Sequence, residues 1–315
     1  MKTLDYLKER IMLQVFVVLA WVTTYVLSLP SSINVDYASF QPVLVISTFL
    51  YFLAGICIWR DIRYIGIGSE LLAAGFMLTI PVLISTYLAM SLNMPLADKE
   101  LIVMDDALGF NWFELIHLVN TTPWLENILS KAYSSFAFQL SLIPILLVAF
   151  GKVKRACAFV AAYGLLCFIS SLIAIWYPAL GTFTMYGVSQ ADVPNIKAVF
   201  GFLFLEDFNA VRTGAEFTLR LDGASGIITF PSVHAAVACL CIWAMWDNIY
   251  TRFPFLILNL FMNLSAITHA NHYLVDIIAG AGIAALTVAV VTPIFMGYRM
   301  VGFKPILSRA QPMAS

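Results

Sequence analysis

Residues 226–240 read GIITFPSVHAAVACL, and residues 265–280 read SAITHANHYLVDIIAG. Both segments are mostly apolar, yet they carry three of the four histidines of the chain and one acid: His234, His269, His272 and Asp276. Ionisable side chains are costly in such apolar surroundings and are usually kept there for function. We therefore expect the chain to fold around these two segments and to place its functional site between them.

His272 and Asp276 are four residues apart. If the chain is helical from Tyr273 onward, both side chains lie on one face of the helix. A carboxylate in that position holds one imidazole tautomer and stabilises the imidazolium cation. The spacing therefore predicts a nucleophilic histidine with an orienting carboxylate.

The sequence Phe230-Pro231-Ser232-Val233-His234 predicts the start of a second helix. Pro231 suits the first helical position, which leaves the next three N–H groups without acceptors inside the helix. Such a helix end favours a phosphate group. His234 in the same turn is placed to protonate a leaving oxygen as a general acid. Phosphoryl transfer through a phosphohistidine needs a nucleophile, an acid and a phosphate site of this kind.

The motif PSVH at 231–234 and the motif HYLVD at 272–276 resemble the second and third signature motifs of the phosphatidic acid phosphatase and vanadium haloperoxidase superfamily. The segments PALGTFTMY at 178–186 and THANHYLVDIIAG at 268–280 are similar to its inositol phosphorylceramide synthase-like branch. The likeness covers residues 177–282. It implies a membrane-bound phosphatase or phosphotransferase of lipid metabolism, with no metal and no cofactor.

The resemblance also implies a role for each motif residue. His272 would be the phosphoryl acceptor and Asp276 its orienting partner. His234 would be the acid, and Ser232 a contact to the substrate phosphate.

Two parts of the family pattern differ in this chain. The third motif of the family begins Ser-Arg, where this chain has Ser265 and Ala266. The first motif is a lysine followed seven residues later by Arg-Pro, whereas Lys197 is followed at that distance by Phe204. The arginines that would hold the phosphate are therefore missing from these positions.

Arg212 and Arg220, in the loop before the second motif, are the expected replacements. A phosphoryl group that loses its leaving group still needs cationic donors. The alternative is that both are interfacial residues whose long side chains carry the charge into water.

Simpler interpretations exist for each histidine. PSxH alone is compatible with a helix start beside a buried histidine. The pair of His272 and Asp276 alone is compatible with two polar side chains that bond each other in a core. Both motifs in the family order favour the catalytic interpretation. His269 either lines the site or forms a hydrogen bond with a neighbouring residue, and we favour the hydrogen bond. His117, far upstream, is interpreted as an interfacial side chain.

The composition indicates a polytopic membrane protein. The chain has 315 residues, of which 61% are hydrophobic and 11% charged, and a mean hydropathy of +0.90; these values exclude an ordinary soluble domain. The net charge of −1 gives no sign of a nucleic-acid partner. The five cysteines lie in apolar stretches without disulfide or zinc spacing, so we interpret them as small core residues.

Eight apolar stretches approach the roughly 20 residues needed to cross a bilayer: 11–29, 42–59, 65–92, 133–151, 156–177, 231–246, 253–268 and 273–298. The predicted fold class is all-α, a transmembrane bundle of about eight spans. We divide it into N-terminal transmembrane and interfacial helices at 1–132, a catalytic helical core at 133–298 and a cytoplasmic tail at 299–315.

Two segments between the spans have mixed polarity. Residues 93–131 predict a solvated acidic loop followed by helices lying in the membrane interface, the second beginning at Pro123. The pair Asp105 and Asp106 favours a solvated turn or a helix cap over a metal site. The long loop at 178–230 is expected to build structure around the site.

Eight spans would place most basic residues on one side of the membrane, as the positive-inside rule requires. Both termini would then be cytoplasmic and the catalytic groups would lie on the opposite face. We expect a phosphorylated lipid as substrate, because helix ends meet lipid headgroups. Water would resolve the intermediate in a phosphatase, and a lipid or polyol hydroxyl in a transferase.

The rival interpretation is a non-catalytic lipid-binding protein or transporter that uses the histidines as a proton relay.

Overall fold

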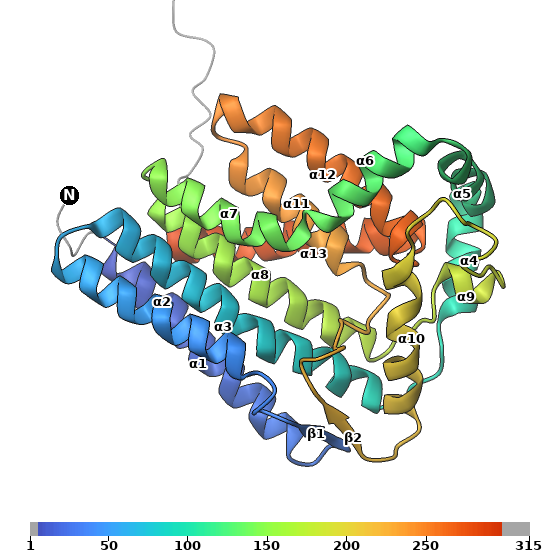
Figure 1. The fold of residues 1–315 in the computed structure, drawn as a ribbon, viewed down its shortest axis with the longest axis horizontal. Helices are drawn as coiled ribbons and strands as arrows, with labels where there is room; N and C mark the ends of the chain where they lie inside the picture. Colours follow the sequence, from blue (N-terminus) through green and yellow to red (C-terminus); the bar gives the residue numbers. More distant parts are fainter. Residues whose placement is uncertain (1–5, 298–315) are drawn as a thin grey trace, which may run out of the picture.

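The computed structural model describes residues 6–297, and in this part of the chain it is built almost entirely of helices (Figure 1). The helices are α1 (Leu7–Ser28), α2 (Gln41–Trp59), α3 (Arg63–Ser91), α4 (Asp98–Ala107), α5 (Trp112–Thr121), α6 (Pro123–Ser134), α7 (Phe136–Ala149), α8 (Val153–Ala174), α9 (Thr182–Met185), α10 (Val199–Arg212), α11 (Val233–Met245), α12 (Ile249–His269) and α13 (Leu274–Met296). The all-α prediction is confirmed, apart from a parallel pair of three-residue strands, β1 (Ile33–Val35) and β2 (Phe217–Leu219).

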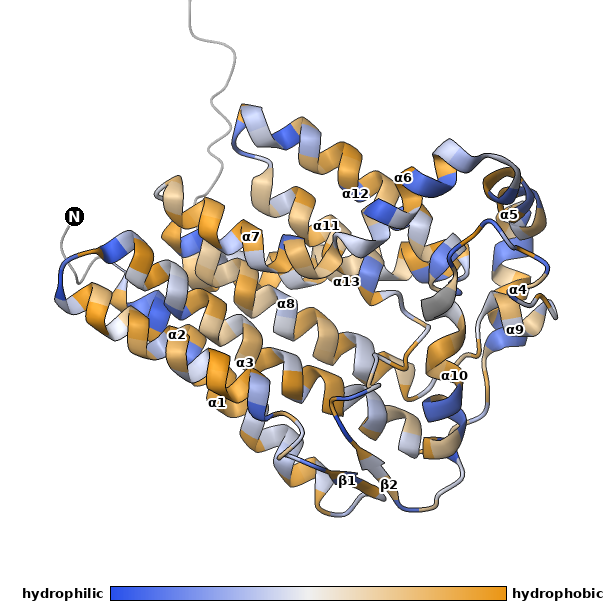
Figure 2. Ribbon diagram, viewed as in Figure 1, coloured by the Kyte–Doolittle hydropathy of each residue, from blue (hydrophilic) through white to orange (hydrophobic). Residues whose placement is uncertain are grey.

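Within residues 6–297, five helices are long and apolar enough to cross a membrane: α1, α2, α3, α8 and α13. Figure 2 shows apolar residues along most of α1, α2 and α8. Large apolar side chains such as Val18, Phe49 and Phe52 are exposed on the outside of α1 and α2, as a lipid-facing surface requires. These helices indicate a multi-pass membrane protein.

The predicted count of about eight spans is not confirmed. Helices α6 and α7 meet at a bend of 57° and together count as at most one further span. Helix α11 has 13 residues, which at 1.5 Å per residue cover about 20 Å of the roughly 30 Å hydrocarbon core. Helix α12 is long enough, but Arg252, Asn259 and Asn263 make it less apolar.

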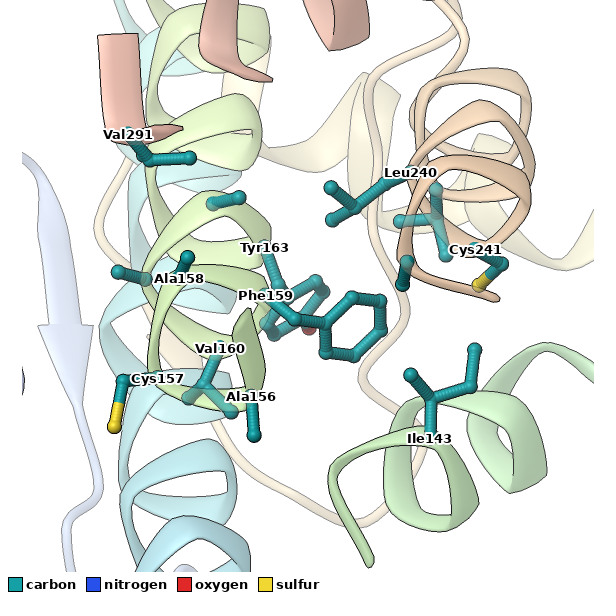
Figure 3. Packing of buried hydrophobic residues seen from close by; sticks show 14 of the residues in the cluster. Ile143, Ala156, Cys157, Ala158, Phe159, Val160, Tyr163, Leu240, Cys241 and Val291 are labelled. Atoms are coloured by element: carbon teal, nitrogen blue, oxygen red, sulfur yellow. The ribbon is translucent and has the colours of Figure 1, made fainter. Parts of the chain in front are cut away.

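Helix α8 lies at the centre of the core and packs against α1, α3, α7, α11 and α13. In Figure 3, Phe159 and Tyr163 project from α8 into the space between Ile143 of α7 and Leu240 of α11. Small residues such as Ala156 on α8 let neighbouring helices approach closely. The buried cysteines of α8 and α11 are free thiols within this core, in line with the sequence interpretation.

The prediction of a solvated acidic loop near residue 100 was wrong. Residues 98–107 form α4, and the side chains of Asp98 and Asp105 are each only 2% exposed. The helices predicted after this loop are present as α5 and α6, and Pro123 stands at the start of α6 as predicted. Helices α4, α5 and α9 gather at one end of the bundle, at the right of Figure 1.

The segment 178–230 contains α9, α10 and β2 rather than an irregular loop. Strand β2 pairs with β1, so that Ile33 lies opposite Phe217 and the segment is tied to the connection between α1 and α2. Helix α10 packs against α3 and α12. The predicted tail at 299–315 and the end of the last predicted span at Tyr298 lie outside the described residues.

Candidate active site

The turn between α12 and α13 holds His272 beside Asp276. Asp276 Oδ2 lies 3.0 Å from His272 Nδ1 and accepts a second hydrogen bond, also of 3.0 Å, from the backbone N–H of Tyr273. Asp276 is fully buried in the first turn of α13. The predicted pairing of the two side chains is present, and because Nδ1 faces the carboxylate, Nε2 is the ring nitrogen left without this partner.

Asn271 sets the backbone of this turn. It adopts a φ of +69°, in the left-handed region, and its side chain is held from both ends. Its Nδ2 donates to the carbonyl oxygen of Leu180 at 2.7 Å, and its Oδ1 accepts from the N–H of Phe183 at 2.5 Å. Gly181 packs directly on Asn271, where any Cβ would collide with the Asn271 carbonyl oxygen. The PALGTFTMY segment therefore positions His272 through Asn271.

Two carboxylates of α4 support the same turn. Asp105 accepts the backbone N–H groups of Leu274 and Val275, both at 2.8 Å. Asp98 accepts the hydroxyl of Tyr273 at 2.9 Å and the N–H groups at the start of the PALGTFTMY segment. Burial raises the pKa of Asp105 above its ordinary value, while the two N–H donors oppose that rise. The free N–H groups at the start of α13 are thus occupied by protein carboxylates rather than left open for a phosphate.

The second motif begins its helix two residues later than predicted. Helix α11 starts at Val233, and Ser232 is its N-cap, with Oγ accepting from the N–H of Ala235 at 3.3 Å. The prediction that Pro231 occupies the first helical position was wrong, because the serine side chain caps the helix and the proline precedes it. Within the described residues, the N–H groups of Val233 and His234 have no acceptor inside the helix.

The two motifs are in direct contact. The backbone N–H of Ser232 donates to the carbonyl oxygen of Asp276 at 3.2 Å. Gly280, one turn further along α13, allows this approach, since a Cβ there would collide with the carbonyl oxygen of Ser232. The start of α11 is thereby fixed against the first turns of α13.

His234 and His272 face one cavity of about 540 Å³. Their ring centroids are 6.4 Å apart, and the rings are tilted by 57°. Thr229 and Ser225 also line the cavity, together with mostly apolar side chains from α3, α7 and α8. Burial lowers the pKa of His272 from 6.5 to about 4, opposed by an interaction with the Thr229 backbone. His272 is therefore neutral near pH 7, as a nucleophile must be.

Tyr133 and His269 stand behind His234. The Tyr133 ring stacks on His234 with centroids 4.6 Å apart and lies parallel to His269 at 6.1 Å. His269 Nδ1 is 2.8 Å from the hydroxyl of Thr268, and its Nε2 is 3.8 Å from Glu126. His269 is not among the residues that line the cavity. These contacts favour the interpretation that His269 bonds its neighbours.

The structure does not bring the two candidate arginines to the cavity. Arg220 is exposed and forms ion pairs with Asp36 at 2.8 Å and Asp222 at 3.0 Å. Arg212 donates to the carbonyl oxygen of Met94 at 2.7 Å. Among the described residues that line the cavity there is no lysine or arginine.

Sequence reasoning missed the roles of Asn271, Asp98 and Tyr133. For Asp105 it offered a helix cap, which Asp105 forms, but it did not identify α13 as the helix. Asn271 lies within the quoted motif, and asparagine is one of the residues that adopt a left-handed backbone most readily. The other three act across contacts between distant parts of the chain and leave no local pattern.

The chain was also compared with known protein families. A model of the PAP2 superfamily matches residues 99–290, which runs from α4 into α13 and includes both motif segments. No curated protein and no solved structure matches the chain. Because the family model covers more than half of the sequence, the chain belongs to the PAP2 superfamily.

Proposed function

We propose that this membrane protein of the phosphatase-type PAP2 superfamily acts on a phosphorylated lipid through a phosphohistidine formed on His272. The observation that carries the proposal is the pairing of His272 Nδ1 with buried Asp276 while His234 shares the same cavity. This arrangement supplies a nucleophile, a group that orients it and a second imidazole for proton transfer.

In the proposed first step, Nε2 of His272 attacks phosphorus and the bond from phosphorus to the leaving oxygen breaks. Burial lowers the pKa of His234 from 6.5 to about 3, so His234 takes up its proton as the anionic phosphate enters the cavity. It gives this proton to the leaving oxygen, and Asp276 stabilises the positive charge on the His272 ring. In the second step, water or a hydroxyl group attacks phosphorus and the P–N bond breaks. His234 takes the proton of the attacking group, which restores both histidines to their starting states.

The N–H groups of Val233 and His234 at the start of α11 are the proposed donors to the phosphate oxygens. Ser232, the N-cap, is fully buried, so we propose that it shapes this phosphate site and contacts the phosphate only through its hydroxyl. We retain Arg212 as a proposed cationic donor, because its buried Nη1 has no hydrogen-bond partner among the described residues.

The scarcity of cationic side chains around the cavity supports a phosphodiester substrate. A phosphate monoester carries up to two negative charges and a diester carries one, so the diester needs less compensation from the protein. Transfer of a phospho-headgroup from such a lipid to a lipid or polyol hydroxyl is the function we propose first. It agrees with the resemblance of residues 268–280 to the inositol phosphorylceramide synthase-like branch. Hydrolysis of a lipid phosphate is the second candidate.

An apolar groove supports a lipid as substrate. It lies between α3, α7 and α8 and shares Thr79, Phe136, Ala137 and Tyr163 with the cavity. An acyl chain in this groove would place a headgroup beside the two histidines. Both termini on the cytoplasmic side and the active site on the opposite face remain part of the proposal.

The test is turnover by purified protein in mixed micelles, with an inositol phospholipid plus a lipid hydroxyl acceptor in one arm and phosphatidic acid in the other. We expect a new phosphodiester lipid in the first arm, its loss in His272→Ala, and unchanged turnover in His117→Ala, where an exposed histidine is removed. Release of inorganic phosphate in the second arm alone would support hydrolysis. Equal turnover by His272→Ala and wild type would contradict the mechanism and favour a lipid-binding protein or transporter.

A further inference from the structure

A second cleft, of about 1000 Å³, lies at the other end of α13 from His272. It is formed by the first residues of α8, the end of α11 and the last turns of α13, at the left of Figure 1. Helix α13 starts at Leu274, and its residues in the cleft run from Ala285 to Met296, so at 1.5 Å per residue the cleft extends from about 17 Å to about 33 Å beyond the start of the helix. The two cavities share no lining residue.

Most of the charged side chains in this cleft are basic. Lys152, Lys154 and Arg155 line it, and Asp247 is the acid among the described lining residues. Asp247 is shared, because it pairs with the Arg155 guanidinium and also lies 3.5 Å from Lys152 Nζ. Lys154 pairs with Glu9, which does not line the cleft, and the Lys154 side chain is 45% exposed. The cleft therefore keeps an excess of positive charge.

The buried guanidinium of Arg155 is incompletely bonded. The residue is 7% exposed and its guanidinium lies 4.7 Å from the centre of the Trp243 ring. Its Nε has no hydrogen-bond partner among the described residues. A buried N–H without an acceptor costs free energy, which a ligand oxygen in the cleft would recover. The start of α8, where Lys152 makes no side-chain cap, adds N–H groups that favour an anion.

The opposite wall of the cleft is apolar and belongs to α13. Ala285, Val288 and Ala289 line it, and α13 is one of the helices suited to crossing a membrane. A soluble anion would leave this wall uncovered, whereas a phospholipid covers it with an acyl chain. Residues 298–315, which follow α13, contain three basic residues and no acid, so they do not complement the charge of the cleft.

We propose that this cleft binds an anionic phospholipid, with its headgroup phosphate at Lys152, Lys154 and Arg155 and an acyl chain along α13. The lipid is a resident ligand, separate from the substrate at His272. The proposal is independent of the reaction assigned to the histidines, because none of its residues contacts their cavity.

Trp243 provides a local probe, since it lines the cleft. Phospholipids with brominated acyl chains quench tryptophan on contact, and the difference between wild type and Trp243→Phe isolates the signal of Trp243. We expect brominated phosphatidylglycerol to quench this signal at lower concentration than brominated phosphatidylcholine. The double variant Lys152→Gln, Lys154→Gln should have a weaker preference for phosphatidylglycerol over phosphatidylcholine. Each lysine removed should lower this preference by about 5-fold. Both lysines are partly exposed, so the variant is expected to fold.

Arg60→Gln is the matched control, because it removes one cation at the exposed end of another helix. It should leave the Trp243 signal and its lipid preference unchanged. Equal quenching by the two lipids would overturn the proposal, as would an unchanged preference in the double lysine variant. Loss of quenching on addition of inorganic phosphate would instead identify a site for free anions and would also overturn it.

Discussion

The carboxylate of Asp105 accepts the backbone N–H of Leu274 at 2.8 Å, across 169 residues of sequence. A side chain of α4 thus caps α13, the helix that carries Asp276 in its first turn. The position of the proposed catalytic carboxylate therefore depends on a short helix near the start of the region that matches the family.

Replacement of Asp105 should disturb the site without removing a reacting group. Asp105→Ala leaves two N–H groups at the start of α13 without their acceptor, a loss of about 1–2 kcal/mol in stability. We expect a lower Tm and a reduced kcat, with partial recovery in Asp105→Asn, which keeps one acceptor oxygen. Asp106→Ala is the control, since Asp106 is exposed. Equal losses in Asp105→Ala and Asp106→Ala would contradict the capping role.

The pH dependence of stability should carry a signature of His272. Burial lowers the pKa of His272 to about 4 from 6.5, so between these values the unfolded chain binds more protons than the folded one. Stability must then fall as the pH falls through this window. We expect a drop in Tm between about pH 6.5 and pH 4. The drop should be smaller in His272→Ala than in wild type, and as large in His117→Ala as in wild type. An identical drop in His272→Ala and wild type would exclude this contribution.

Arg212 and Arg220 should respond differently to substitution. Arg220 is held in exposed ion pairs, which contribute about 0–1 kcal/mol, so Arg220→Ala should keep near-normal kcat per folded molecule. If Arg212 supplies a donor to the phosphate, Arg212→Ala should lose about 10²–10³ in kcat. Arg212→Lys should fold but turn over poorly, because lysine lacks the planar fork of arginine. Near-normal kcat in Arg212→Ala would remove it from the mechanism.

The proposed sidedness can be tested at Asp222, which is exposed in the segment before the second motif. A cysteine introduced there should react with a membrane-impermeant maleimide in intact cells. The described native cysteines provide a low background, because four are buried and Cys239 is partly buried. Protection of the new cysteine until the cells are lysed would place the active site on the cytoplasmic face.

Local patterns in the sequence predicted the central pair of the site. The spacing of four predicted that His272 and Asp276 pair. Helix α13 begins only at Leu274, so Asp276 reaches back to His272 from the first turn of the helix. The start of α11 was harder, since Pro231 and Ser232 are both typical of helix starts, and the serine occupies the cap.

Contacts between distant segments could not be predicted. The acids Asp98 and Asp105 lie in a polar stretch, which is typical of a solvated loop. Their partners Tyr273 and Leu274 are 175 and 169 residues away, and no local pattern encodes such a contact. The number of spans was also uncertain for a physical reason, because hydropathy alone does not distinguish a short buried helix such as α11 from one that crosses the bilayer.

The central claim is that His272 carries the phosphoryl group, and trapping that group tests it most directly. In His234→Ala, a p-nitrophenyl phosphodiester still forms the intermediate because its leaving group needs no acid, whereas resolution lacks its base. Mass spectrometry of the intact protein and its peptides after a short incubation should then find an acid-labile phosphoryl adduct on His272. The adduct should be absent from His234→Ala, His272→Ala. An adduct on another residue would contradict the account. So would release of p-nitrophenol by the double variant at the rate of His234→Ala.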